Sequence, residues 1–139
     1  MISKQILSSI PKAIRIIRAL SKKSAEPQLP LHQLRILFLV GEGMGQTQIA
    51  ETLGVSTPAV SKIVNQLAEK DFIERAGCED RRCVKLSLTS GGSRIMKSVS
   101  KKLENHFEFA LKTLTSTEKN DLERGLKILD KLMIKVSEV

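Results

Sequence analysis

Polar side chains recur between residues 47 and 65 at spacings that suit contact with a nucleic acid. If a helix begins at Ser56 or Thr57, then Thr57, Ser61 and Asn65 share one outward stripe, and Pro58 and Lys62 share the next. Hydroxyl, amide and ammonium groups can bond base edges or phosphates, whereas the alternative for each is a solvated surface residue. The candidates for DNA contact in this stretch are Thr47, Gln48, Ser56, Thr57, Pro58, Ser61, Lys62 and Asn65.

Thr47 and Gln48 enter this set for a different reason, because they fall at the start of a short helix that precedes the first stripe. Free backbone amides and the positive end of the helix dipole converge there, and both favour a phosphate. We therefore expect these two residues to contact the DNA backbone.

A second group of reactive side chains lies in the sequence C-E-D-R-R-C, residues 78–83. Arg81 and Arg82 can reach phosphates or a minor groove from the tip of a turn, or they can be solvated turn residues. If Cys78 and Cys83 face each other across a hairpin, they could form a disulfide, and the adjacent arginines would favour the reactive thiolate. Two reduced thiols are the alternative, and a metal site that uses both cysteines with Asp80 is a weaker one.

Catalytic and cofactor-binding patterns find little support in this chain. His32 and His106 are far apart in sequence, and there is no Ser-His-Asp set, phosphate loop or metal-ligand spacing. Each histidine is better interpreted as a surface or interface residue. We expect a protein that is not an enzyme and that binds no cofactor or metal.

The elements that must hold the polar stripes form a helix-turn-helix. Ala50, Gly54 and Val60 have its spacing, since a small residue and a glycine let two helices cross closely and an apolar residue fills their angle. Gly54 is expected at positive φ, and Val55 is expected to follow as an apolar plug. Ser56 or Thr57 should cap the second helix. An ordinary helical hairpin is the alternative.

A β-hairpin is predicted directly after the second helix. FIERA (72–76) and CVKLSLT (83–89) have strand patterns, and GCEDRR (77–82) forms the turn between them. In the second strand Val84, Leu86 and Leu88 alternate with polar residues. A hairpin in this place, with arginines at its tip, is typical of the wing of a winged helix.

The remaining segments predict amphipathic helices. One spans roughly residues 3–23, where Pro11 kinks it or splits off its first turns, and another spans 31–41. A long helix follows Thr89, and Thr115 with Glu118 forms a capping box for the last helix. The apolar seam of that helix consists of Leu122, Leu126, Leu129, Met133 and Val136. So much apolar face predicts a homodimer, with a self-contained monomer as the alternative.

Composition supports a single folded unit with a polyanionic partner. The 139 residues carry 23 Lys and Arg against 15 acids, a formal charge of +8, yet residues 46–90 carry six of each. The absence of Trp and Tyr argues against single-strand binding. No apolar run is long enough to span a membrane, and no signal peptide is evident, so we expect a cytoplasmic protein with no membrane partner.

The sequence resembles the MarR family of bacterial regulators. The resemblance is carried by Asp80, Arg81 and Arg82, followed at the family's spacing by Leu88, Thr89 and Gly92, and by GVSTPAVSKIVNQL, FIER and LTSTEK. It implies that Asp80 orients the wing, that Arg81 or Arg82 enters the minor groove, and that the start of the recognition helix reads bases. It also implies that a lipophilic small-molecule effector binds between the DNA-reading and dimer helices.

These inferences together predict a mainly α fold with a small β-hairpin wing. We expect residues 1–139 to form one regulator domain, in which 31–92 make up the winged helix-turn-helix and 1–30 and 93–139 the helical dimerisation region. The expected function is sequence-specific binding of double-stranded DNA, with repression by promoter occlusion and release by a small-molecule or redox signal. The alternative is a winged-helix module that binds another protein and not DNA, which the neutral charge of residues 46–90 leaves open.

Overall fold

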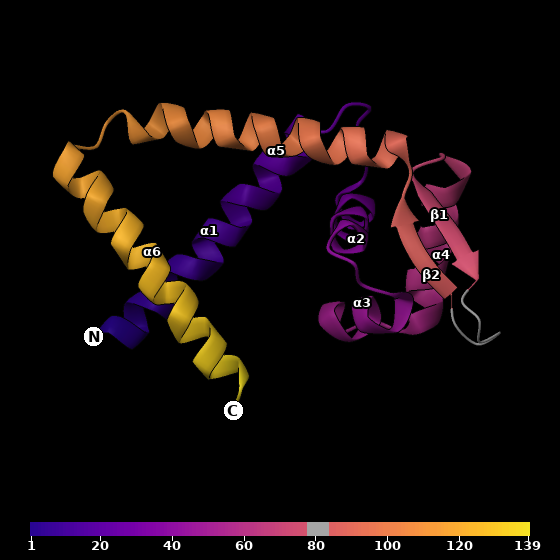
Figure 1. Ribbon diagram of the computed structural model, residues 1–139, viewed down its shortest axis with the longest axis horizontal. Helices are drawn as coiled ribbons and strands as arrows, with labels where there is room; N and C mark the ends of the chain where they lie inside the picture. The colour runs from indigo at the N-terminus through magenta and orange to yellow at the C-terminus, as the bar shows by residue number, and fades with distance from the viewer. Residues whose placement is uncertain (78–83) are drawn as a thin grey trace. The chain divides into compact units, whose positions relative to one another are not determined.

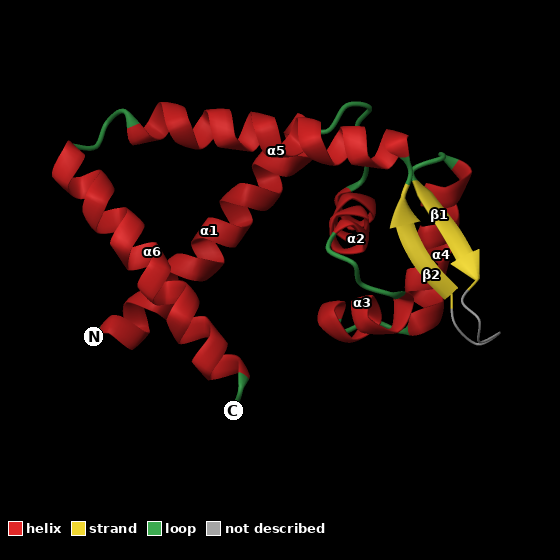
Figure 2. Ribbon diagram, viewed as in Figure 1, coloured by secondary structure: helices red, strands yellow, loops and turns green. Residues whose placement is uncertain are grey.

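The computed structural model describes residues 1–77 and 84–139, which form six helices and one two-stranded antiparallel sheet (Figures 1 and 2). The elements are α1 (Ile2–Ser24), α2 (Leu31–Gly41), α3 (Gln46–Leu53), α4 (Thr57–Glu69), β1 (Ile73–Gly77), β2 (Val84–Leu88), α5 (Ser90–Leu111) and α6 (Ser116–Ser137). The predicted fold class is confirmed. The candidates Cys78, Asp80, Arg81, Arg82 and Cys83 lie outside the described residues, so their roles stay predictions.

The described residues form two compact units, Met1–Leu103 and Glu104–Val139. The first unit contains the helix-turn-helix, the hairpin and the first part of α5. The second contains the end of α5 and all of α6. In the described part of the chain, no helix is both long enough and apolar enough to cross a membrane.

Helices α1 and α2 follow the predicted ranges closely. α1 continues without interruption through Pro11, so the expected splitting of its first turns is wrong. In the first turn of a helix the backbone amides have no intrahelical acceptor, so a proline there costs no hydrogen bond. Pro11 lies well beyond the first turn, and the helix continues although one backbone hydrogen bond is missing at this position. α2 has the predicted bounds.

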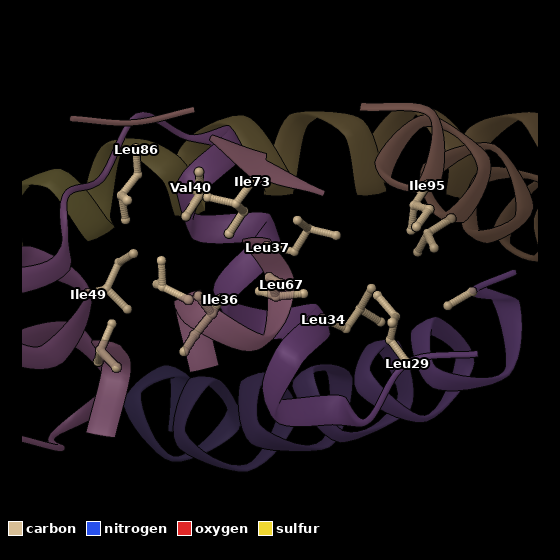
Figure 3. Close-up of a cluster of buried hydrophobic side chains, with 14 of the residues drawn as sticks. Leu29, Leu34, Ile36, Leu37, Val40, Ile49, Leu67, Ile73, Leu86 and Ile95 are labelled. Atoms are coloured by element: carbon tan, nitrogen blue, oxygen red, sulfur yellow. The ribbon is translucent and has the colours of Figure 1, made fainter. Parts of the chain in front are cut away.

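The core of the first unit forms around α2 (Figure 3). Ile36 and Leu37 of α2 are almost completely buried, as are Ile49 of α3 and Leu67 of α4. Leu34 and Val40 of the same helix are buried as well. α2 is therefore enclosed on more than one side and acts as the central support for the elements around it.

The hairpin is joined to α5 by a tight set of contacts at Thr89. Its hydroxyl donates to the Asp71 carbonyl at 2.6 Å and accepts from the Gly92 amide at 3.1 Å, and its own amide donates to the Phe72 carbonyl at 3.1 Å. A Cβ atom on Gly92 would lie 2.2 Å from the Phe72 carbonyl oxygen. The spacing of Thr89 and Gly92 is thus explained by the backbone of Phe72, which lies close to both residues at the base of the hairpin.

The helical segment after Thr89 also follows the sequence prediction. Ile95 and Val99 of α5 are buried, and Leu103 packs against the core. The predicted capping box of α6 is present, with the Glu118 amide donating to the Thr115 hydroxyl at 3.1 Å and the Thr115 amide donating to the Glu118 carboxylate at 2.8 Å. The start of α6 is therefore fixed by its own sequence.

Candidate nucleic-acid interface

The turn between α3 and α4 sets the angle of the two helices. Gly54 has φ 67°, in the left-handed region that glycine favours, as the sequence predicts. The Val55 amide donates to the Ala50 carbonyl at 3.0 Å. The predicted role of Val55 as an apolar plug is wrong, because its side chain is 47% exposed. Its backbone closes the turn, and Val60, with no exposed surface, fills the space inside it.

Helix α4 begins with a well-formed cap. The Ser56 hydroxyl accepts a hydrogen bond from the Ala59 amide at 3.2 Å, and Pro58 lies in the first turn, where its missing N–H leaves no intrahelical acceptor unpaired. Of the two predicted caps, Ser56 is therefore the one used. This cap places the exposed residues Thr57 and Pro58 at the end of the helix that projects from the turn.

The two faces of α4 differ sharply in burial. Val60, Val64 and Leu67 are buried against the core, and Ile63 is half-buried. On the opposite side the predicted contact residues Thr57, Pro58, Lys62 and Asn65 are exposed, while Ser61 is half-buried. The exposed face of α4 is thus a polar stripe with one basic residue, Lys62, and the opposite face of the helix packs against the apolar core.

Helix α3 lies beside α4 and offers a free N-terminus. Its N-cap residue is Gly45, and no side chain caps the helix. Thr47 and Gln48 in its first turn are both exposed. The first amides of an uncapped helix are available to an acceptor such as a phosphate. The structure therefore leaves both residues accessible, as their predicted role requires.

The hairpin adds two basic residues that the sequence analysis did not select. Its register pairs Gly77 with Val84 and Arg75 with Leu86, next to residues 78–83. Arg75 and Lys85 are both exposed. In the view of Figure 1 this end of the hairpin lies on the same side of the first unit as α3. The sequence places Arg75 and Lys85 in the two strands next to an arginine pair. This position could have marked them as basic contact residues, but the sequence analysis used it only to predict the strands.

A polar network behind α4 was also missed. Gln33 of α2 is 5% exposed, its Nε2 group donates to Gln66 Oε1 at 3.1 Å, and its Oε1 atom accepts from Lys70 Nζ at 2.7 Å. Both partners belong to the last turns of α4 and its C-cap. No sequence signal connects Gln33 with residues more than thirty positions away, so only the fold reveals the contact.

A largely apolar cavity of about 400 Å³ lies on another side of α2. Two basic residues, Arg18 and Arg35, are among those that line it. The other lining residues are Ile17, Ser21, Leu31, Leu34, Phe38, Leu39, Thr52, Leu53, Met96, Val99 and Leu103. A cavity with this lining suits a mainly apolar molecule that carries a negative charge.

Comparison with known proteins identifies the winged helix-turn-helix. Residues 29–84, which span α2 to the start of β2, match the model of the MarR family. The match covers the winged helix-turn-helix and less than half of the chain. Its winged helix-turn-helix is therefore similar to that of the MarR family.

Individual proteins with similar sequences or folds include a transcriptional regulator of the HTH type. An uncharacterized HTH-type transcriptional regulator of Bacillus subtilis, YfiV, is 26% identical over 108 residues, which cover 76% of this chain and 68% of that protein. The crystal structure of RV1404 from Mycobacterium tuberculosis has a TM-score of 0.76 at 20% identity and covers 94% of this chain and 92% of its own. Streptococcus pneumoniae FabT, solved in complex with DNA, has a TM-score of 0.69 at 22% identity and covers 97% and 96%. At these identities the two structures show the shared fold.

Proposed function

We propose that this protein binds a specific double-stranded DNA site as a homodimer and represses transcription by covering the promoter. The observation that carries the proposal is α4, which is capped at Ser56, buried through Val60 and Val64, and exposed along Thr57 and Lys62. A helix held rigidly from one side and polar on the other fits the major groove.

The individual contacts follow from position. Thr57, Ser61, Lys62 and Asn65 would face base edges from α4, with Ser56 and Pro58 at its start. Thr47 and Gln48 would bind phosphates from α3. Arg81 or Arg82, oriented by Asp80, would reach the minor groove. Arg75 and Lys85 on the hairpin would add electrostatic affinity for the backbone.

Exposed apolar surface supports the homodimer. In α6, whose residues are all described, none is buried, and Leu126 is 52% exposed. In α1 the side chains of Ile14 and Ile17 are also exposed. Such faces are stable in water when a partner covers them, and a second copy would also place two recognition helices on one duplex.

Light scattering tests the homodimer directly. At micromolar concentration the protein should have twice the chain mass of 15.4 kDa. Leu126→Lys would place a charge in the apolar face and should return the mass to that of one chain. Lys127→Ala, which removes an exposed charge on the same helix, is the control and should stay dimeric. A wild-type monomer would remove the two-fold model of binding.

The cavity beside α2 supports regulation by a small molecule. We infer that a lipophilic anion binds there, with its charge near Arg18 or Arg35, and weakens DNA binding. α2 lines the cavity and also packs on α4, so a change at one side can alter the other. A redox signal through Cys78 and Cys83 is the second form of control that the sequence predicts.

Mobility shifts on the DNA upstream of the protein's own gene test the function. The protein should shift this duplex at a lower concentration than a scrambled duplex of equal length. Candidate lipophilic anions, added singly, should reduce the shift, and mild peroxide should reduce it if the cysteines sense oxidation. Equal, weak shifts on both duplexes would favour the alternative of a protein-binding module.

A further inference from the structure

Gln33 is the one polar residue among the buried residues of α2. Its neighbours Leu34, Ile36 and Leu37 are all buried in the core. An amide placed in such surroundings destabilises the fold unless its oxygen and nitrogen are both hydrogen-bonded. In this structure both are bonded, to Gln66 and Lys70, at 3.1 and 2.7 Å.

Chemistry fixes the direction of this chain of hydrogen bonds. The Lys70 ammonium group can only donate, so the atom of Gln33 that faces it must be the oxygen. The Gln33 nitrogen then faces Gln66 and needs an acceptor, which the Gln66 oxygen supplies. The orientation of all three side chains is therefore determined together.

Gln66 lies in the last turns of α4 and Lys70 is the C-cap of this helix, and both are bonded to the same residue of α2. The apolar contacts of Val64 and Leu67 hold α4 against the core, but such contacts have no preferred direction and permit small rotations of a helix. Hydrogen bonds are directional and limit those rotations. Lys62 and Asn65 lie on the same helix, so their direction depends on its rotation.

We propose that Gln33 is a positioning residue for sequence recognition, which sets the rotation of α4 through Gln66 and Lys70. It touches no DNA itself. The proposal rests on the DNA-binding function proposed above. It predicts that loss of the network reduces discrimination between DNA sequences and leaves nonspecific affinity unchanged, since phosphate contacts tolerate small rotations better than base contacts do.

The test uses the full-length protein and measures affinities for the upstream duplex and a scrambled duplex by fluorescence anisotropy. Gln33→Met keeps the length of the side chain and removes both hydrogen bonds. It should reduce the preference for the upstream duplex about five- to tenfold, the loss expected for one or two hydrogen bonds. Affinity for the scrambled duplex should change by less than about twofold. Gln28→Met, at an exposed residue before α2, should match the wild type.

Rescue distinguishes positioning from simple stability. Gln33→Glu still accepts from Lys70, and the Gln66 amide can rotate to donate to it, so preference should return to within about twofold of the wild type. Gln66→Met, at a half-buried residue, should reduce preference, and the double variant with Gln33→Met should be no worse than Gln33→Met alone. If Gln33→Met does not fold, the Gln66→Met variant by itself tests the proposal.

The outcomes separate this proposal from the proposed function. If the wild type prefers the upstream duplex and both methionine variants keep that preference, Gln33 has no positioning role. A parallel fall in affinity for both duplexes, with a lower melting temperature and no rescue by Gln33→Glu, also overturns the proposal. If the wild type shows no preference at all, the proposed function fails first.

Discussion

The winged helix-turn-helix and α6 show two ways in which an amphipathic sequence can be stabilised. In the former, Leu37, Ile49 and Leu67 have no exposed surface, and one chain supplies the whole core. In α6 the apolar seam is equally regular, yet Leu126 and Val136 are more than half exposed. Since both segments have a helical period, the pattern alone shows which face is apolar but not which molecule covers it.

The largest expected effect is loss of the core. Leu67→Ala should lower the free energy of unfolding by about 2 to 5 kcal/mol, because it leaves a cavity among fully buried neighbours. Leu122→Ala, at a 43% exposed residue of the α6 seam, should cost clearly less at concentrations where the chain is monomeric. Urea unfolding monitored by circular dichroism measures both. Equal costs at low concentration would contradict the distinction between the two regions.

A pair of glycines sharpens the comparison. Gly92→Ala should destabilise the protein by about 1 to 3 kcal/mol, because the new Cβ would lie 2.2 Å from the Phe72 carbonyl oxygen and the backbone must shift. Gly125 in α6 has no atom within 4 Å of its Cβ position. Gly125→Ala should therefore stabilise the helix by about 0.5 to 1 kcal/mol. Thermal melts measure both, and destabilisation by both variants would show that α6 is packed more closely than its exposure indicates.

Local chemistry explains what the sequence could predict. The bounds of α2, the left-handed Gly54, the Ser56 cap and the Thr115–Glu118 box each depend on residues within a few positions of one another. Such short-range rules hold whatever the rest of the chain does.

The errors arise where distant residues decide the outcome. Val55 is exposed because Val60 already fills the turn, which no local rule indicates. The partners of Gln33 come from α4, and the residues of the site are arranged by that packing. The candidate contact residues on α4 were predictable because their inward neighbours are spaced regularly.

The smallest expected losses of stability come from the helix caps. Ser56→Ala and Thr115→Ala should each cost about 1 kcal/mol, because each removes an acceptor for an N-terminal amide. At temperatures well below melting, Ser56→Ala should also weaken DNA binding, since it loosens the start of α4. Thr115→Ala should bind DNA as the wild type does if it stays dimeric. Anisotropy titrations after a thermal melt measure this, and equal weakening by both would contradict a separate DNA-reading region.

The central claim is that the exposed stripe of α4 and the hairpin residues read DNA. Its most direct test is a series of affinities for the upstream and scrambled duplexes at increasing salt, with Lys62→Ala and Arg82→Ala beside the wild type. The wild type should prefer the upstream duplex and lose affinity as salt rises. Arg82→Ala should weaken both duplexes and flatten the salt dependence by roughly one counterion per contact. Lys62→Ala should cost about 1 to 3 kcal/mol on the upstream duplex alone. A wild type without salt-dependent affinity for either duplex would contradict the account.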